Sequence, residues 1–309
     1  MNTQIEKIAS NIEKVIVGKH YVVLEVLTAM LCGGHVLIED VPGVGKTQLV
    51  SALSRSVEGV FNRVQMTPDI MPSDITGFSM YNRDENKFEF CKGSAFCNFL
   101  LADEINRASP KAQSSLLEIM EEFQVSIDGH TYPLLQPFMV LATQNPVETY
   151  GTYHLPEAQM DRFIMKISLG YPLPQEEFDI LARNEYDNPV ASLSPVATVE
   201  EICALQEQAK QINAVASVKQ YIINIVAATR NNEFITLGAS PRGSIALFKV
   251  AKAFAFIEGR DFITPDDVRR FAVPVLAHRL MLSPRGKSAF GSAENAIANI
   301  VSQIQVPVR

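Results

Sequence analysis

Short apolar runs alternate with amphipathic stretches through the first half of the chain. The runs are nearly continuous and rich in Val, Ile, Leu and Phe, which is the pattern of strands buried on both faces. The stretches between them carry the wider apolar spacing of helices. This alternation predicts a doubly wound α/β fold with a parallel sheet. The five predicted strands are residues 35–39, 61–66, 98–103, 137–143 and 163–169.

The second half of the chain has a different pattern and is predicted to be helical. Two of its helices have clear start signals, because Ser240 and Thr264 each place a capping hydroxyl directly before a proline. The change of pattern lies close to residue 172. We therefore expect an α/β domain over residues 1–172 and a small all-α domain over residues 173–309.

One hairpin is predicted between the third and fourth strands. The segment 124–135, QVSIDGHTYPLL, places Asp128 and Gly129 between residues of alternating polarity. An Asp-Gly pair in this setting favours a tight two-residue turn. The segment is therefore expected to be a β-hairpin outside the parallel sheet.

Composition excludes several classes of protein. The chain has 309 residues, 47% of them hydrophobic, with a formal net charge of -7 and a pI of about 5.4. This balance argues against a generally basic nucleic-acid binder. No apolar run reaches 18 residues, so no membrane span is expected. The four cysteines lack C-x-x-C spacing, which disfavours a zinc site and favours a reducing cytoplasm.

A candidate phosphate-binding loop follows the first predicted strand. Residues 39–50, EDVPGVGKTQLV, match most of the pattern G-x-x-x-x-G-K-[ST]. Gly43 and Gly45 permit unusual backbone dihedrals, so that successive amides converge on phosphate oxygens. Lys46 is placed to reach the β- and γ-phosphates, and Thr47 offers a hydroxyl to Mg²⁺. An apolar strand before the loop and a helix after it complete the expected context.

Asp40 stands where the pattern has its first glycine. That position marks the change from strand to loop and is the least engaged with phosphate. Aspartate adopts turn conformations more readily than most residues. We expect Asp40 to bend the chain without abolishing nucleotide binding.

Other polar residues follow the later strands. Asp103 and Glu104 end the strand in NFLLADE, where Asp103 can hold the Mg²⁺ shell and Glu104 can orient the attacking water. Asn145 lies just beyond the next strand, and its amide is a candidate partner of the water or the γ-phosphate. The alternative, two solvated acids and an ordinary Asn-Pro turn, is weaker beside a phosphate loop.

Two arginines are candidate phosphate ligands. Arg162 immediately precedes the last strand, which we expect to bring it near the edge of the nucleotide face. Arg242 lies in the first turn of a helix, where a cation is disfavoured unless it has an anionic partner. The alternative for both arginines is a surface salt bridge. For Arg162, the partner would be Asp161 or Glu157.

The chain resembles the AAA+ ATPases and, within them, the MoxR family. Essentially the whole chain takes part. The stretches RVQMTPDIMPSDITG and LLADEINRASPKAQSSLLEIMEE carry the family signal most specifically. The other matching stretches are VIVGK, LIEDVPGVGKT, LATQNPVETYGTYHLPEAQMDRF, SPRGSIAL and TPDDVRRFAVPVLAHRL. Members of this family often lack the first glycine of the loop, which favours a working site despite Asp40.

The resemblance implies a five-stranded AAA+ core followed by a helical lid, with ATP and Mg²⁺ as cofactors. It implies that Asp103 and Glu104 are the acidic pair and that Asn145 is the first sensor. Arg242 would be the second sensor and would reach phosphate from the lid. Arg162 would be the arginine finger and would reach a neighbouring subunit's ATP. Thr47 and Asp103 would be the metal ligands. The implied nucleotide-binding residues are Val17, Gly18, Gly43, Val44, Gly45, Lys46, Thr47 and Gln48.

The resemblance further implies assembly and partners. Family members form rings, commonly hexamers, and act as chaperone-like remodelers of protein clients, often with proteins that carry von Willebrand A domains. The hairpin at 124–135 would face a ring's pore or a client. Two alternatives remain: a nucleotide-dependent scaffold with slow hydrolysis, and the ATPase subunit of a metal-chelatase-like complex. A nucleic-acid motor is disfavoured by the acidic charge and by the lack of an aromatic and basic strip.

Overall fold

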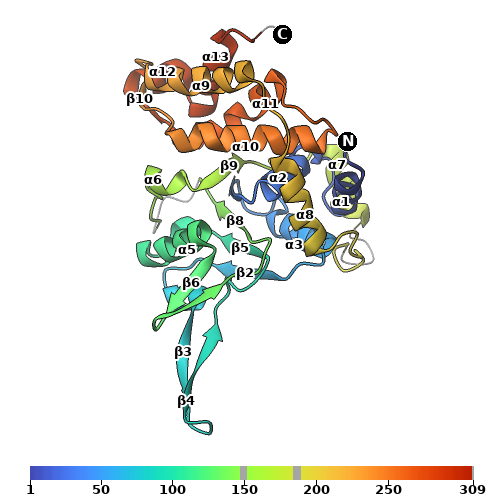
Figure 1. The fold of residues 1–309 in the computed structure, drawn as a ribbon, viewed down its shortest axis with the longest axis vertical. Coiled ribbons are helices and arrows are strands. Elements are labelled where there is room, and N and C mark those ends of the chain that lie inside the picture. The colour runs from blue at the N-terminus through green and yellow to red at the C-terminus, as the bar shows by residue number, and fades with distance from the viewer. Residues whose placement is uncertain (147–151, 184–188, 308–309) are drawn as a thin grey trace.

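A five-stranded parallel sheet forms the centre of the computed structural model, which describes residues 1–146, 152–183 and 189–307. The strands are β1 (His35–Glu39), β2 (Phe61–Gln65), β5 (Phe99–Asp103), β8 (Met139–Gln144) and β9 (Phe163–Ile167). Their order is β2-β5-β8-β1-β9, and every neighbouring pair is parallel (Figure 1). The doubly wound α/β fold and its five strands are therefore confirmed.

Apart from the edge strand β2, the strands of the sheet are buried on both faces, as their nearly continuous apolar sequences require. In β1, Val36 and Ile38 join one apolar cluster, whereas Leu37 between them joins another. Helices cover the two faces. The first face carries α1 (Thr3–Glu13), α2 (His20–Leu31) and α3 (Lys46–Ser56), and the second carries α4 (Pro72–Thr76) and α5 (Pro110–Glu122).

The C-terminal part is helical, as predicted. Its helices are α8 (Val199–Lys210), α9 (Ala216–Arg230), α10 (Pro241–Ile257), α11 (Pro265–Leu276), α12 (Pro284–Phe290) and α13 (Ala293–Gln303). The expected caps are present: Ser240 accepts a hydrogen bond from the amide of Arg242 at 3.1 Å, and Thr264 and Asp267 form a reciprocal capping box. A short antiparallel pair, β10 (Ile235–Leu237) and β11 (Met281–Leu282), joins two loops of this part.

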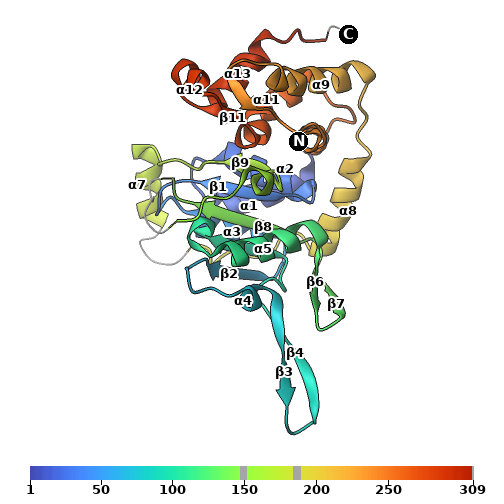
Figure 2. The same ribbon diagram turned by 90° about the vertical axis from the view of Figure 1, so that its left-hand side faces the viewer.

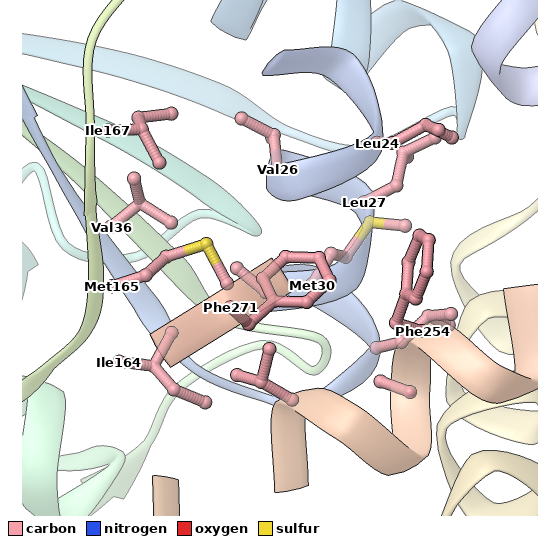
Figure 3. Packing of buried hydrophobic residues seen from close by; sticks show 14 of the residues in the cluster. Leu24, Val26, Leu27, Met30, Val36, Ile164, Met165, Ile167, Phe254 and Phe271 are labelled. Carbon is pink, nitrogen blue, oxygen red and sulfur yellow. The ribbon is translucent and has the colours of Figure 1, made fainter. Parts of the chain in front are cut away.

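The helical part shares an apolar core with the first face of the sheet. Figure 3 shows Met30 of α2 and Met165 of β9 close to Phe271 of α11 and Phe254 of α10. All four side chains are at most 5% exposed. The two parts are thus held by buried apolar packing, which is the dominant stabilising term in folding.

Two hairpins lie outside the parallel sheet, and one of them projects beyond its β2 edge (Figures 1 and 2). The predicted one is present as β6 (Gln124–Ile127) and β7 (His130–Pro133), with Asp128 and Gly129 both at positive φ. The other, β3 (Gly77–Asn82) and β4 (Lys87–Lys92), was not predicted and projects far from the sheet (Figures 1 and 2). Its turn has no Asn-Gly or Asp-Gly pair to mark it in the sequence.

The remaining elements are short. They are α6 (Glu157–Met160), α7 (Pro174–Arg183) and two 3₁₀ turns at Ile105–Arg107 and Ala277–Arg279. In the part of the chain that the structure describes, no helix is long and apolar enough to cross a membrane.

Candidate nucleotide site

The phosphate loop connects β1 to α3 at the carboxyl edge of the sheet. Gly43 and Gly45 have φ values of 84° and 92°, in the left-handed region that favours glycine. No described side chain caps the start of α3, so its first amides remain available to a ligand. A helix N-terminus with free amides binds anions, and phosphate is the ligand that this loop type holds.

Asp40 has structural contacts that the sequence did not reveal. Its carboxylate accepts hydrogen bonds from the Ser168 hydroxyl at 3.1 Å, the Leu169 amide at 2.5 Å and the Gly170 amide at 3.0 Å. Its backbone carbonyl accepts from the Lys46 ammonium at 3.0 Å. The side chain is buried and joins the loop to the end of β9. Asp40 therefore anchors the chain as well as turning it.

These contacts give a prediction for Asp40→Gly. The loss of three hydrogen bonds, two of them to backbone amides, should lower the free energy of unfolding by about 2 kcal/mol or more. ATP affinity should change by less than about tenfold, or 1.4 kcal/mol, because the carboxylate faces β9 rather than the loop cavity. Urea unfolding and nucleotide titration measure the two effects. Asp40→Asn, which keeps one oxygen acceptor, should lose less stability than Asp40→Gly; equal stability of all three proteins would contradict the anchor role.

The acidic pair lies at the end of β5, next to Thr143 of β8. The Thr143 hydroxyl donates to Asp103 Oδ1 at 2.6 Å and accepts from the Glu104 amide at 2.8 Å. Glu104 has a φ of 58°, which is uncommon for a residue with a Cβ. Such strained backbone is found where a functional side chain must be aimed in one direction.

Three further side chains hold the acidic pair, and sequence reasoning missed them. Arg63 donates to Asp103 Oδ2 at 2.6 Å, Gln65 donates to Glu104 Oε2 at 2.8 Å, and Arg107 donates to the same oxygen at 3.1 Å. Arg63 and Gln65 are two apart on β2 and so point to the same face. Their alternation on a predicted strand is visible in the sequence, but only the pairing of β2 with β5 places them beside the two carboxylates.

A cavity of about 390 Å³ brings the predicted loop, acidic pair and first sensor together. Asn145 is buried and lines it, facing the same space as the loop. The lining residues are Pro42, Gly43, Gly45, Lys46, Thr47, Gln48, Arg63, Gln65, Asp103, Glu104 and Asn145. A set of amides, one ammonium and two carboxylates around one concavity fits the phosphates of a nucleotide and a cation.

A second cavity of about 260 Å³ adjoins the first, since Gly43, Gly45 and Gln48 line both. Its other walls include Val17, Val44 and Ile180 of α7. These are largely apolar, as a base-binding pocket requires. Gly18 lies behind this wall with a φ of 71°, and a Cβ there would collide with the Glu176 carboxylate.

Arg162 lies at the opposite edge of the sheet, so the expectation that it lies near the nucleotide face of its own subunit is wrong. Arg162 precedes β9, and in a parallel sheet the start of every strand faces away from the loops that follow the strands. Its guanidinium pairs with Glu121 of α5 at 3.0 Å. The alternative partner Asp161 instead pairs with Arg279 at 2.6 Å.

Arg242 accompanies Arg162. The second-sensor expectation placed Arg242 at the phosphate, but the residue lies outside the phosphate cavity of its own subunit. It pairs with the other carboxylate oxygen of Glu121 at 2.7 Å. Both arginines line a cavity of about 230 Å³ at the amino edge of the sheet, together with Gly34 and Lys249. One carboxylate between two guanidiniums leaves an excess of positive charge, which suits an anion.

Two buried histidines add no charge to this edge. Burial lowers the pKa of His35 to about 4, opposed by its hydrogen bond to the Met120 carbonyl. Burial, followed by the nearby Arg279 guanidinium, lowers the pKa of His278 well below its usual value. The positive charge of the amino edge therefore comes from the arginines and lysine and is constant at neutral pH.

Comparisons with known proteins agree with this geometry. Residues 35–165 match the family model described as ATPase family associated with various cellular activities (AAA), and residues 227–301 match the AAA lid domain. The Bacillus subtilis protein YeaC is 49% identical over 98% of this chain and 95% of its own length. Chaperone MoxR1 of Mycobacterium tuberculosis is 40% identical over 98% of this chain and 82% of its own.

A solved structure is similar throughout. The crystal structure of a protein assigned as an ATPase from Cytophaga hutchinsonii superimposes with a TM-score of 0.92 at 38% identity, covering 99% of this chain and 95% of that one. The α/β core, the helical lid and the nucleotide cavity thus occur together in a chain that has a relative named as a chaperone. It is an ATPase and belongs to the MoxR family of AAA+ ATPases.

Proposed function

We propose that this chain is a Mg²⁺-dependent ATPase that works as a ring, most simply a hexamer, and remodels protein clients. One observation carries the proposal: the phosphate loop lies at one edge of the sheet and Arg162 and Arg242 lie at the other. A strand of five residues spans about 16 Å, so a subunit cannot complete its own site. Head-to-tail contacts that close into a ring would bring the two edges together.

The chemistry of the proposed site follows from the side chains in the cavity. Lys46 and the amides at the start of α3 would bind the β- and γ-phosphates. Glu104 would accept a hydrogen bond from the attacking water, after release from Gln65 or Arg107. Asn145 would hold the water or the γ-phosphate. Arg162 and Arg242 of a neighbour would stabilise the charge that builds on the departing phosphate.

Mg²⁺ fits the donors of this cavity. The Thr47 hydroxyl and the Asp103 carboxylate are hard oxygen ligands, and they line the same space. Among the described residues no cluster of three or more His, Cys, Asp and Glu forms a metal cage. Mg²⁺ commonly binds through one or two protein oxygens plus phosphates, so it would arrive with the nucleotide. It would neutralise charge on the β- and γ-phosphates.

The finer features of the proposal rest on the family and the fold. The relative named as a chaperone supports a protein client, and a von Willebrand A domain protein is the proposed partner. The hairpin β6–β7 would face the pore or the client, and the cytoplasm is the proposed compartment. We place the boundary between the two domains at residues 172 and 173, which the separate matches at 35–165 and 227–301 support.

Two other functions remain distinct candidates: a nucleotide-dependent scaffold with slow hydrolysis, and the ATPase subunit of a metal-chelatase-like complex. The amino-edge arginines favour hydrolysis over a scaffold, because two cations aimed at a γ-phosphate serve the transition state. Comparing ATP turnover with and without a partner separates a remodeler from a scaffold, since a scaffold's turnover would not respond.

Lys46→Ala tests whether the loop binds ATP. The change removes the only ammonium that lines the described part of the phosphate cavity, so stable ATP binding should be lost. Titration with a fluorescent ATP analogue measures the affinity. Lys166→Ala is the matched control, because this lysine pairs with Glu39 and Glu294 and lines neither nucleotide cavity. Unchanged affinity of Lys46→Ala would refute the assignment of this loop.

A further inference from the structure

The helix α7 has two faces with different surroundings. Glu176 contacts Lys19 at 3.7 Å, Ile180 lines the apolar nucleotide cavity, and Arg183 donates to the backbone carbonyls of Glu13 and Lys14. These three residues recur at helical spacing and fix the inner face of α7 on the core. The helix is therefore held in place beside the nucleotide site.

The outer face of α7 is apolar, acidic and exposed. Phe178 and Leu181 are 65% and 69% exposed and lie on one face because they are three residues apart. Glu177 is also exposed and, among the described residues, has no ion pair. Leu173 extends the apolar surface at 65% exposure. An anchored helix with this much exposed apolar surface is a typical interaction site.

A groove on the lid has the opposite charge. Ile222 and Ile223 of α9 and Ile245 and Phe248 of α10 line an apolar cavity of about 360 Å³, and Ile223 and Ile245 are 51% and 55% exposed. A neighbouring apolar cavity of about 300 Å³ shares Ile245 and Phe248. We call these two adjoining cavities together the lid groove.

Lysines surround the lid groove. Lys210 pairs with Glu207, whereas Lys219, Lys249 and Lys252 have no ion pair among the described residues. Lys219 and Lys252 lie over the Phe248 ring at 6.0 Å and 5.5 Å. Partial burial and the charge of Lys219 lower the pKa of Lys252. The groove thus has unneutralised positive charge in a chain whose net charge is -7.

The outer face of α7 lies beside the nucleotide site, and the lid groove lies beside the arginine cavity; these are the two sites that meet in the proposed ring contact. Ile180 places α7 at the nucleotide cavity, whereas Ile245 and Lys249 line the cavity of Arg162 and Arg242 as well as the lid groove. In Figure 2, α7 and α8 lie on opposite sides of the molecule, and the end of α8 borders the groove. If one subunit's arginines meet the next subunit's nucleotide, the lid groove is carried towards the next subunit's α7.

We infer that the lid groove binds α7 of a second copy of this chain. Phe178 and Leu181 would enter the apolar floor, and Glu177 would face the lysines. The contact is heterologous, with different surfaces on the two subunits, and so propagates around a ring. Because α7 also walls the nucleotide cavity, occupancy of that cavity and the subunit contact would support each other. This inference rests on the proposed ring.

Charge exchange tests the pairing. Sedimentation velocity of the full chain, with Mg²⁺ and a non-hydrolysable ATP analogue, gives the concentration at which half of the protein is assembled. Glu177→Lys and Lys249→Glu should each raise this concentration by about tenfold, and the double variant should return to within about threefold of the original. Lys219→Glu is a second lid variant, and it is combined with Glu177→Lys in the same way to test whether it restores assembly. Phe178→Ala should weaken assembly by about 30-fold.

Controls separate a surface effect from misfolding. Asp266→Lys reverses a lid charge whose side chain is 88% exposed and should leave assembly unchanged. Phe88→Ala removes an exposed phenylalanine from the β3–β4 hairpin and should also leave it unchanged. Urea unfolding of each variant identifies any loss of assembly that comes from misfolding rather than from the changed surface.

Cross-linking gives a second, independent measurement. A mixture of chains carrying Leu181→Cys with chains carrying Ile223→Cys should form a dimer with a short bismaleimide, above the level from the four native cysteines alone.

The outcomes distinguish this inference from the proposed function. If the chain assembles but Glu177→Lys, Lys249→Glu and Phe178→Ala have no effect, the inference is overturned and the ring stands, with the groove left to another protein. The inference is also overturned if Glu177→Lys weakens assembly and neither Lys249→Glu nor Lys219→Glu restores it. If the original chain remains a monomer with the ATP analogue, both the ring and this contact are refuted.

Discussion

Glu104→Gln should lower the ATP turnover number by a factor of about 10² or more while leaving ATP affinity nearly unchanged. Glutamine keeps the size of the side chain and one oxygen acceptor, so the contacts from Gln65 and Arg107 to Glu104 Oε2 can persist. It loses the negative charge that attracts the proton of the attacking water. Steady-state phosphate release and equilibrium nucleotide titration separate the two effects.

Two comparisons sharpen this experiment. Glu118→Gln is the same change at an exposed position of α5 and should have no effect on turnover. Asp103→Asn should instead shift the Mg²⁺ concentration required for half-maximal activity, because Asp103 is one of the two proposed metal ligands. If Glu104→Gln hydrolyses ATP at the native rate, Glu104 is not the catalytic carboxylate.

The sheet could be predicted because its physical signal is local. A strand buried on both faces must be apolar at nearly every position, and four of the five runs satisfy this; the exception is the edge strand β2, where Arg63 and Gln65 are exposed. The loop glycines, Lys46 and the acidic pair follow the ends of these runs. Since the carboxyl ends of parallel strands share one edge, the parallel direction of the strands was enough to predict that these residues lie at the same edge of the sheet.

The contacts around the acidic pair could not be predicted in the same way. Arg63 and Gln65 precede Asp103 by about forty residues, and only strand order places β2 beside β5. Asp40 likewise bonds to residues 168–170, a contact that depends on β1 lying next to β9. Strand neighbours in a doubly wound sheet are fixed by tertiary packing rather than by local pattern.

The position of Arg162 was open to prediction and was missed. A residue directly before a parallel strand lies at the amino edge, opposite the phosphate loop. The partner Glu121 was less accessible, because it comes from the last turn of α5 on a different layer. Its shared contact with Arg242 also requires the lid to dock on the core through the apolar packing in Figure 3.

Arg162→Ala should bind ATP normally and hydrolyse it about 10³-fold or more slowly, the range found for arginine fingers in other phosphoryl-transfer systems. The arginine lies outside both nucleotide cavities of its own subunit, so its loss leaves the binding surface intact. A permanent charge and a planar fork suit it to stabilise a departing phosphate. Single-turnover hydrolysis and nucleotide titration measure the two predictions.

Mixing gives the decisive comparison, because Arg162→Ala chains retain their loops and Lys46→Ala chains retain their arginines. In a mixed ring, some intact loops meet intact arginines across an interface, so a mixture of the two inactive proteins should recover activity. Arg285→Ala is the matched control, since this arginine of α12 has a side chain that is 83% exposed, lines none of the cavities described above and should not need rescue. If mixing restores nothing, and if activity per intact loop is independent of protein concentration, Arg162 does not act across an interface. The pairing of Arg162 and Arg242 with Glu121 would then be their whole function, and the ring mechanism would be refuted.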